Sequence, residues 1–145
     1  VLQPRLLKAR TMRHTLLMLL MIQAQPLWAE PVIIGHPGLQ SLDLPTLQRI
    51  YTGKVVEVGG VRVTPVNLPP GDRLRQRFLE RYLSQDEDAY VGYWTVRRYV
   101  GKGAPPRELD QAGDVIQFVN RTAGAIGYVD ESDLREGLHV LRQAP

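Results

Sequence analysis

The chain has 145 residues, of which 43% are hydrophobic and 23% charged, with 11 prolines, 13 glycines and no cysteine. This length allows one ordinary domain, or a domain preceded by a targeting segment, and is short for two full domains. The composition is that of a folded globular protein, and the absence of cysteine excludes a disulfide framework, a thiolate metal site and a cysteine nucleophile.

The positive charge of the chain is concentrated at its N-terminus. Four of the 18 basic residues and none of the 15 acidic ones lie in residues 1–29. The remaining residues carry 14 basic and 15 acidic side chains and are close to neutral. The pI near 9.4 therefore reflects the N-terminal segment, and it gives no support to nucleic-acid binding.

Residues 12–29 have the order of parts that a secretory signal peptide requires. Arg13 precedes an apolar run over residues 16–22, and a short stretch that contains Pro26 ends at Ala29. The run is too short to cross a bilayer, which needs about 20 residues. The alternative is a buried helix of the folded domain, but the run has no amphipathic period and Pro26 would end it.

We therefore predict a signal peptide over residues 1–29, cleaved after Ala29, and a folded domain over residues 30–145. An uncleaved anchor is the alternative, and Met12 is a candidate for the true first residue. No second hydrophobic stretch follows. We expect a protein that is soluble outside the cytoplasm.

Glycine, proline and capping residues divide the first half of the domain. The apolar run over residues 31–35 predicts a buried strand. Asp43 with Pro45 predicts a short helix over residues 44–51. A hairpin is predicted around Gly59-Gly60, with strands over residues 54–58 and 61–66. Asp72 is expected to cap a helix that runs to about Leu83 and buries Leu74 and Phe78.

The second half continues the alternation of helices and strands. An acidic start and several bulky side chains predict a helix over residues 84–100, followed by a glycine- and proline-rich loop over residues 101–106. The remaining expected elements are a helix over 112–122 with Val115, Phe118 and Val119 inward, a strand over 123–129, a turn over 130–135 and a strand over 138–141. This alternation predicts an α/β fold with a small sheet covered by helices.

No catalytic constellation stands out. His36 and His139 each stand alone, which favours structural roles over a ligand or base role. The acidic run over residues 86–88 is typical of a first helical turn, where carboxylates complement the helix dipole. We expect no metal site, no cofactor and no enzymatic activity.

An anion site is better founded. The segment over residues 69–75 places a turn directly before a helix N-terminus, where free N–H groups and the dipole favour an anion. Gly71 gives the turn, and Arg73 and Arg75 would add charge and bidentate hydrogen bonds. The alternative is an exposed basic helix face on which Asp72 is only a cap, occupying the N–H groups that an anion needs.

Two further groups remain open. Lys102 and Gly103 could present an ammonium and a flexible backbone to a ligand, or they could form a plain loop after a helix. The aromatic residues of the preceding helix are expected to lie mostly in the core, although any left exposed would suit an interface. These residues are Tyr90, Tyr93, Trp94 and Tyr99.

Two segments carry a resemblance to a known family. Residues 44–54, Leu-Pro-Thr-Leu-Gln-Arg-Ile-Tyr-Thr-Gly-Lys, resemble the segment that opens the second domain of periplasmic phosphate-binding proteins of ABC transporters. Residues 122–129, Thr-Ala-Gly-Ala-Ile-Gly-Tyr-Val, are similar to the Thr-Pro-Gly-Ala-Ile-Gly-Tyr-Val motif of that family. Two further segments match the same family, residues 63–66 as the strand that follows the first segment and residues 72–83 as the helix after the ligand loop. Together the matches span about residues 32–142. The resemblance is strongest to the short, stand-alone members.

This resemblance implies a periplasmic-binding-protein-like fold with one lobe and a periplasmic location. Where the full-length family has a Ser-Gly-Thr-Thr type loop, this sequence has Gly71-Asp-Arg-Leu-Arg75. The candidate ligand residues are therefore Gly71, Asp72, Arg73 and Arg75, with Lys102 and Gly103 as the second group.

The function that we predict is binding of phosphate or another small oxyanion, linked to ABC-type phosphate uptake or sensing. The partners expected are the oxyanion, a membrane transporter or sensor, and a second copy of the chain. The alternative function is an accessory module of a membrane protein that keeps the fold without a ligand.

Overall fold

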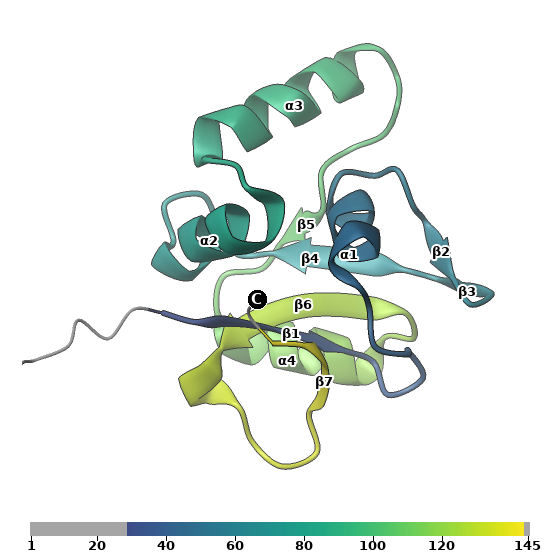
Figure 1. The fold of residues 1–145 in the computed structure, drawn as a ribbon, viewed down its shortest axis with the longest axis vertical. Helices are drawn as coiled ribbons and strands as arrows, with labels where there is room; N and C mark the ends of the chain where they lie inside the picture. The colour runs from purple at the N-terminus through teal and green to yellow at the C-terminus, as the bar shows by residue number, and fades with distance from the viewer. Residues whose placement is uncertain (1–28, 144–145) are drawn as a thin grey trace, which may run out of the picture.

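In the computed structural model, residues 29–143 are described, and they form a five-stranded mixed sheet with helices on both faces and a separate two-stranded hairpin (Figure 1). The predicted signal peptide falls almost entirely on residues 1–28, outside the described residues. Among the helices of the described part, none has the length and apolarity that a membrane span requires.

Most of the predicted elements are present at or near the predicted bounds. The first half contains β1 (Pro31–Gly35), α1 (Leu44–Tyr51), β2 (Glu57–Val58), β3 (Val61–Arg62), β4 (Thr64–Asn67), α2 (Arg73–Phe78) and a π-helical turn (Leu79–Leu83). The second half contains α3 (Glu87–Tyr99), β5 (Arg107–Glu108), α4 (Ala112–Arg121), β6 (Ala125–Asp130), a 3-10 turn (Glu131–Asp133) and β7 (His139–Arg142).

The sheet has the strand order β5-β4-β6-β1-β7. β4 runs parallel to both of its neighbours, β5 and β6, whereas β1 is antiparallel to β6 and β7. The β1–β6 register pairs Pro31 with Asp130 and Gly35 with Ile126. A bulge interrupts the β1–β7 pairing between Ile33 and Ile34. All five residues of β1 are buried, which is expected of a strand with neighbours on both sides.

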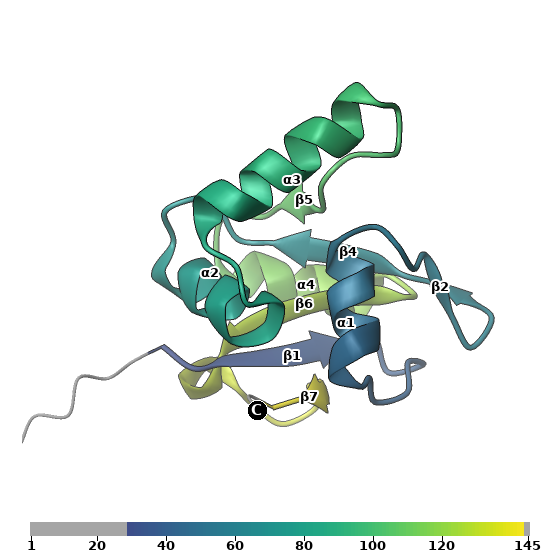
Figure 2. The same cartoon turned by 45° about the horizontal axis from the view of Figure 1, so that its top comes forward.

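Two adjacent residues of β6 show how the helices are layered. The ring of Tyr128 stacks on Phe78 of α2, with ring centroids 4.1 Å apart. A Cβ on Gly127 would meet Val115 of α4 at 2.5 Å. Successive side chains of a strand point to opposite faces, so α2 and α4 cover opposite faces of the sheet. Tyr51 of α1 also contacts Phe78, at 4.7 Å between centroids, and this places α1 on the α2 face (Figure 2).

Local capping explains why α1 begins and ends where the sequence predicts. The Asp43 carboxylate accepts a hydrogen bond from the Thr46 N–H at 2.8 Å, and Pro45 lies in the first turn. After the helix, Gly53 adopts φ +70°, a conformation that L side chains rarely adopt. A Cβ there would also meet the Trp94 ring at 2.6 Å. Glycine is therefore required at this position for two independent reasons.

The predicted hairpin is shorter than expected. Its turn lies at Gly59-Gly60 as predicted, but only two residues on each side pair, in β2 and β3. The chain then continues as β4, which leaves the hairpin and joins the main sheet between β5 and β6. β5 was not predicted, because two exposed residues after a proline-rich loop carry no hydrophobic pattern.

The helix expected over residues 84–100 spans Glu87–Tyr99 and buries only some of its bulky side chains. Tyr90 and Trp94 are buried, but Val96, Tyr99 and Val100 are exposed. In α4, Ile116 is buried with Val115 and Val119, while Phe118 is only half-buried. In both Figure 1 and Figure 2, α3 projects from the rest of the molecule, so one side of it meets the body.

Candidate functional site

The loop between β4 and α2 is where the sequence places the anion site. Asp72 N–H donates to the Pro69 carbonyl at 3.2 Å and closes a turn over Pro70 and Gly71. Gly71 has φ +88°, which a residue with a Cβ would adopt only at a cost. The turn delivers the chain directly to the N-terminus of α2, as predicted.

A buried polar network fixes the carboxyl end of β4 just before this loop. The Tyr128 hydroxyl donates to Asn67 Oδ1 at 2.9 Å and accepts from the Leu68 N–H at 3.1 Å. Asn67 Nδ2 donates to the Tyr90 hydroxyl at 3.1 Å, and that hydroxyl donates to the Tyr51 carbonyl at 3.1 Å. Strands β4 and β6 and helices α1 and α3 are thereby tied together at one point.

Burial keeps the phenols of this network neutral. Desolvation raises the pKa of Tyr90 to about 12, against hydrogen bonds that lower it. It also raises the pKa of Tyr51 and of Tyr128 well above the ordinary value of 10. The network therefore acts as a set of neutral hydrogen bonds at physiological pH.

The Asp72 side chain occupies the N-terminus of α2. Its Oδ1 accepts hydrogen bonds from the Leu74 N–H at 2.8 Å and from the Arg75 N–H at 3.1 Å. These are the donors that an oxyanion would use at a helix N-terminus. The protein's own carboxylate thus stands where the charge of a bound anion would be.

Arg75 donates four hydrogen bonds to groups of the protein. Its Nε and Nη2 donate to the two carboxylate oxygens of Glu87, at 2.9 and 2.6 Å, in a bidentate pair. Its Nη1 donates to Glu108 Oε1 at 3.1 Å and to the Leu68 carbonyl at 2.9 Å. The Arg75 residue is 2% exposed, and its guanidinium lies 5.6 Å from the centroid of the Tyr90 ring.

This arrangement connects three elements through one cation. Arg75 lies on α2, Glu87 is the first residue of α3 and Glu108 is the last residue of β5. Burial acts to lower the pKa of Arg75, but the hydrogen bonds and charge of Glu87 outweigh it and the pKa is raised. The guanidinium is thus permanently charged and fixes the base of α3 to the β4–α2 corner.

The structure brings four of the six predicted ligand residues together. Gly71, Asp72, Arg73 and Arg75 follow one another at the α2 N-terminus, and Arg73 is exposed there. The other two, Lys102 and Gly103, lie in the loop after α3, where the Lys102 N–H donates to the Arg97 carbonyl at 2.8 Å. α3 has 13 residues and is about 20 Å long, so the two groups lie at opposite ends of it.

A groove of about 300 Å³ begins at the loop and runs between α3 and the segment before β5. Its walls are formed by Pro70, Tyr90, Val91, Trp94 and Pro105, with Arg98 and Glu108 as charged lining residues. Arg75 also lines it, but its donors are occupied as described above. The groove is therefore mainly apolar, with Arg98 as a cation whose side chain is exposed.

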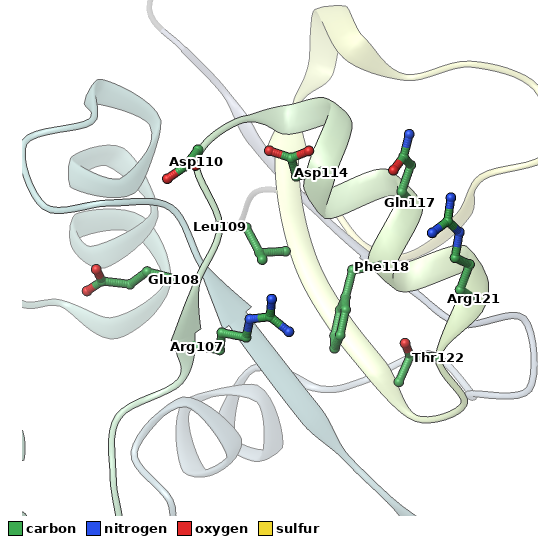
Figure 3. A pocket seen from close by; sticks show the side chains of 9 residues that line it. All are labelled: Arg107, Glu108, Leu109, Asp110, Asp114, Gln117, Phe118, Arg121 and Thr122. Carbon is green, nitrogen blue, oxygen red and sulfur yellow. The ribbon is translucent and has the colours of Figure 1, made fainter.

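A second pocket, of about 370 Å³, lies on the α4 face of the sheet (Figure 3). β5 and the residues after it form one side, and α4 forms the other. Arg107 lies 5.9 Å from the centroid of the Phe118 ring, and the other charged lining residues are Glu108, Asp110, Asp114 and Arg121. Its charged lining residues are exposed or half-buried, and it is separate from the β4–α2 loop.

The two histidines of the described residues have local structural contacts. His139 Nε2 lies 2.6 Å from the Leu39 carbonyl oxygen, and the Gly38 N–H points at His36 Nδ1 at 3.5 Å. Between residues 29 and 143 no three His, Asp or Glu side chains gather in a way that could hold a metal ion.

The sequence analysis did not predict the two acidic residues that pair with the Arg75 guanidinium. Glu87 was interpreted only as part of an acidic first turn, a role that Asp86 fills by capping α3 through the Ala89 N–H at 2.8 Å. Glu108 lies in the strand that was not predicted. The sequence signal that was available is the presence of one buried arginine position among apolar helix residues, since a buried arginine requires acidic partners.

Solved structures of other proteins share the fold of this chain. No family model matches the sequence, and no curated protein matches it. An ABC-type phosphate transport receptor from Vibrio cholerae aligns over 79% of this chain with 13% identity and a TM-score of 0.60. A putative phosphate ABC transporter substrate-binding protein from Clostridium perfringens, solved with bound phosphate, aligns over 79% with 18% identity and a TM-score of 0.62.

The chain has the fold of phosphate receptors of ABC transporters. It spans only 46% and 44% of the length of these two receptors. The predicted α/β fold of the periplasmic-binding-protein type, in a shorter single-lobe form, is thereby confirmed. At these identities the likeness concerns the fold alone.

Proposed function

We propose that this protein is a solute-binding-like receptor for phosphate or another small oxyanion, linked to ABC-type uptake or sensing. The observation that carries the proposal is the fold shared with two phosphate receptors over 79% of the chain. The turn-to-helix segment at the α2 N-terminus supports it through Arg73, which is exposed there, although the Leu74 and Arg75 N–H groups already donate to Asp72.

The site that we propose consists of Gly71, Asp72, Arg73 and Arg75. Arg73 is exposed and free to approach a ligand without rearrangement, whereas Arg75 must exchange a partner first. Its contact with Glu108 is the replaceable one, because the Glu108 side chain is 48% exposed and that of Glu87 is 24% exposed. An oxyanion competes with this carboxylate, so we expect weak binding, in about the micromolar to millimolar range of dissociation constants.

Asp72 determines which protonation state of an oxyanion binds best. An ionised carboxylate repels any oxyanion, but it accepts a hydrogen bond from an oxyanion that carries a proton. We therefore expect phosphate species, which carry a proton at neutral pH, to bind better than a fully ionised oxyanion such as sulfate. Lys102 and Gly103, at the far end of α3, would serve a separate contact and not the same small ligand.

Titration calorimetry tests the proposal, with phosphate and sulfate added to the wild-type protein and to three variants. Phosphate is expected to give heat that sulfate does not, and Arg73→Ala is expected to remove it. Glu108→Gln is expected to strengthen binding, because it removes the carboxylate that competes for Arg75. The matched control is Arg135→Ala, an exposed arginine in the loop before β7, which should bind as the wild type does.

A flat titration of both the wild type and Glu108→Gln with millimolar phosphate would contradict the proposal. That result favours the second candidate, an accessory module of a membrane protein that keeps the fold without a ligand. The observation behind this candidate is the pairing of Arg75 with Glu87 and Glu108, because these carboxylates of the protein take the place that an anionic ligand would have. Both candidates place the protein in the periplasm, which follows from the predicted signal peptide and is checked by fractionation of the producing cells.

A further inference from the structure

The outer face of α3 carries a continuous stripe of small and apolar side chains. At spacings of three and four residues it contains Val91, Gly92, Thr95, Val96 and Tyr99, which lie along one side of a helix. Val91 is 46% exposed, Val96 62% and Tyr99 91%. With Val100 beside them, these side chains make up four of the five large hydrophobic residues that are exposed among residues 29–143.

The side of α3 opposite the stripe packs on the body, while Val91 and Thr95, at one edge of the stripe, border the groove described above. The Tyr93 hydroxyl donates to the Thr52 carbonyl at 2.6 Å, and the Trp94 ring covers Gly53. Arg97 Nη2 donates to the Gly53 carbonyl at 3.3 Å. The helix thus lies across the end of α1 with its other side turned outward, as both views of the fold show (Figures 1 and 2).

The charges at the two ends of α3 have opposite signs. Asp86 and Asp88 are exposed at its N-terminal end, and Arg98 and Lys102 are exposed at its C-terminal end. No charged residue interrupts the stripe between Asp88 and Arg98 on the outer side. A second α3 that runs antiparallel would place acid against base at both ends and would also oppose the two helix dipoles favourably.

We propose that the protein forms a two-fold symmetric dimer through antiparallel contact of the outer faces of α3. With the symmetry axis between Tyr93 and Trp94, Val91 of one copy faces Val96 of the other. Gly92 faces Thr95, and nothing lies within 4 Å of a Cβ built at Gly92, so the two helices approach closely there. Asp88 meets the end of the partner helix at its Arg98 and Tyr99.

The expected strength of this dimer follows from its size. Stable dimers bury roughly 1,200–2,000 Å² in total, and one pair of helices of this length supplies less. We therefore expect a dissociation constant in about the micromolar to sub-millimolar range, with formation favoured at low salt. The dimer depends on α3 alone and holds whichever ligand the loop before α2 binds.

Sedimentation equilibrium in phosphate-free buffer tests the proposal. The wild type is expected to show a monomer–dimer equilibrium, and Val96→Glu is expected to weaken it by at least tenfold. Val56→Glu is the matched control, because Val56 is the one exposed large hydrophobic residue away from α3 in the described chain, and it should leave association unchanged. Far-UV circular dichroism checks that each variant remains folded.

A charge exchange tests the antiparallel orientation itself. Asp88→Arg and Arg98→Asp alone each bring like charges together and are expected to weaken the dimer several-fold. Combined in one chain they restore opposite charges, and the affinity should return to within about twofold of the wild type. Since the chain has no cysteine, Thr95→Cys should also be joined across the axis by a short thiol cross-linker, whereas Arg135→Cys should not.

Three outcomes overturn the proposal. The protein remains monomeric up to millimolar concentration, or it dimerises with equal strength after Val96→Glu, or the double charge exchange fails to recover what the single exchanges lose. None of these outcomes bears on phosphate binding, which the calorimetry measures separately.

Discussion

The corner between β4 and α2 and the outer face of α3 differ in how their side chains are satisfied. At the corner, a buried guanidinium donates four hydrogen bonds to two carboxylates and a carbonyl. On α3, between 9 and 13 residues further along the chain from Glu87, the side chains of Val96, Tyr99 and Val100 are exposed. The corner therefore contributes to the stability of the fold. The outer face of α3 contributes little to that stability and is available for contact with another protein surface.

A charged residue near a helix terminus can have a structural role or a ligand-binding role, and the corner contains a candidate for each. A sequence pattern of basic residues after a turn is typical of an anion site, yet here one arginine is internal and one is external. Arg75 is held by Glu87, whereas Arg73 is exposed. Which of the two bears on stability and which on ligand binding is therefore open to direct measurement.

The largest expected effect is that of Arg75→Met. The substitution removes the cation from a buried ion pair, leaves Glu87 without its partner and orphans the Leu68 carbonyl, so the free energy of unfolding should fall by about 3–5 kcal/mol. Urea denaturation measures this. Arg73 lies two residues before Arg75 and is exposed, so Arg73→Met should change the free energy of unfolding by less than about 0.5 kcal/mol. Equal effects of the two substitutions would show that the corner does not depend on its buried cation.

The next effect is a loss of stability in alkali. Because the folded pKa of Tyr90 is about 12 and the ordinary value is 10, the folded state holds its proton more tightly than the unfolded state. The stabilisation is complete below about pH 10 and is lost as pH rises toward 12, by roughly 3 kcal/mol.

Phenolate absorbance followed together with circular dichroism checks this prediction. The phenols of Tyr51, Tyr90 and Tyr128 should ionise only as the protein unfolds, in one coupled transition. Tyr90→Phe serves as the comparison variant, since it removes one of the linked protons and should make the alkaline loss of stability less steep. Ionisation of all six tyrosines with the fold intact would contradict the buried network.

A smaller effect is expected from the cap of α2. Asp72→Ala removes the acceptor of the Leu74 and Arg75 N–H groups and should lower the free energy of unfolding by about 1 kcal/mol. Asp72→Asn keeps an acceptor and should lose much less. Thermal denaturation of the pair separates capping from charge, and identical losses in both variants would exclude a capping role for the side-chain oxygen.

The smallest change in the free energy of unfolding is expected for substitutions on the outer face of α3. Val96→Ser and Tyr99→Ser alter side chains that make no packing contact with the body, so each should change the free energy of unfolding by less than about 0.5 kcal/mol. The measurement is urea denaturation at low protein concentration, where the monomer dominates. A loss of more than 1 kcal/mol would mean that the outer face takes part in the fold.

Much of the fold was predictable because its boundaries are written in short local patterns. Asp43, Gly53, Gly59-Gly60 and Asp72 each mark a cap or a turn whose geometry depends on neighbours in the sequence. The burial of Leu74 and Phe78 followed from helical spacing in the same way. These predictions concern distances of a few residues, over which local physical chemistry decides.

The candidate site was predictable only in its position. The partners of Arg75 lie 12 and 33 residues away in the chain, and no local pattern relates them to it. For α3, spacing shows that a helix has bulky residues on more than one side, but which side meets the body depends on where α1 ends. The sequence therefore predicted that most aromatic residues of this helix lie in the core, but it did not single out Tyr99 as the exposed one.

The position of β1 has a consequence for how the chain acquires its structure. β1 lies between β6 and β7, and both of these neighbours follow it by some 90 residues or more. Such long-range pairings fold slowly, because the intervening chain must be ordered before they form. The pairings of β1 with β6 and β7 therefore cannot form until residues 125–142 have been synthesised and have left the ribosome. Until then β1 has neither of its partner strands.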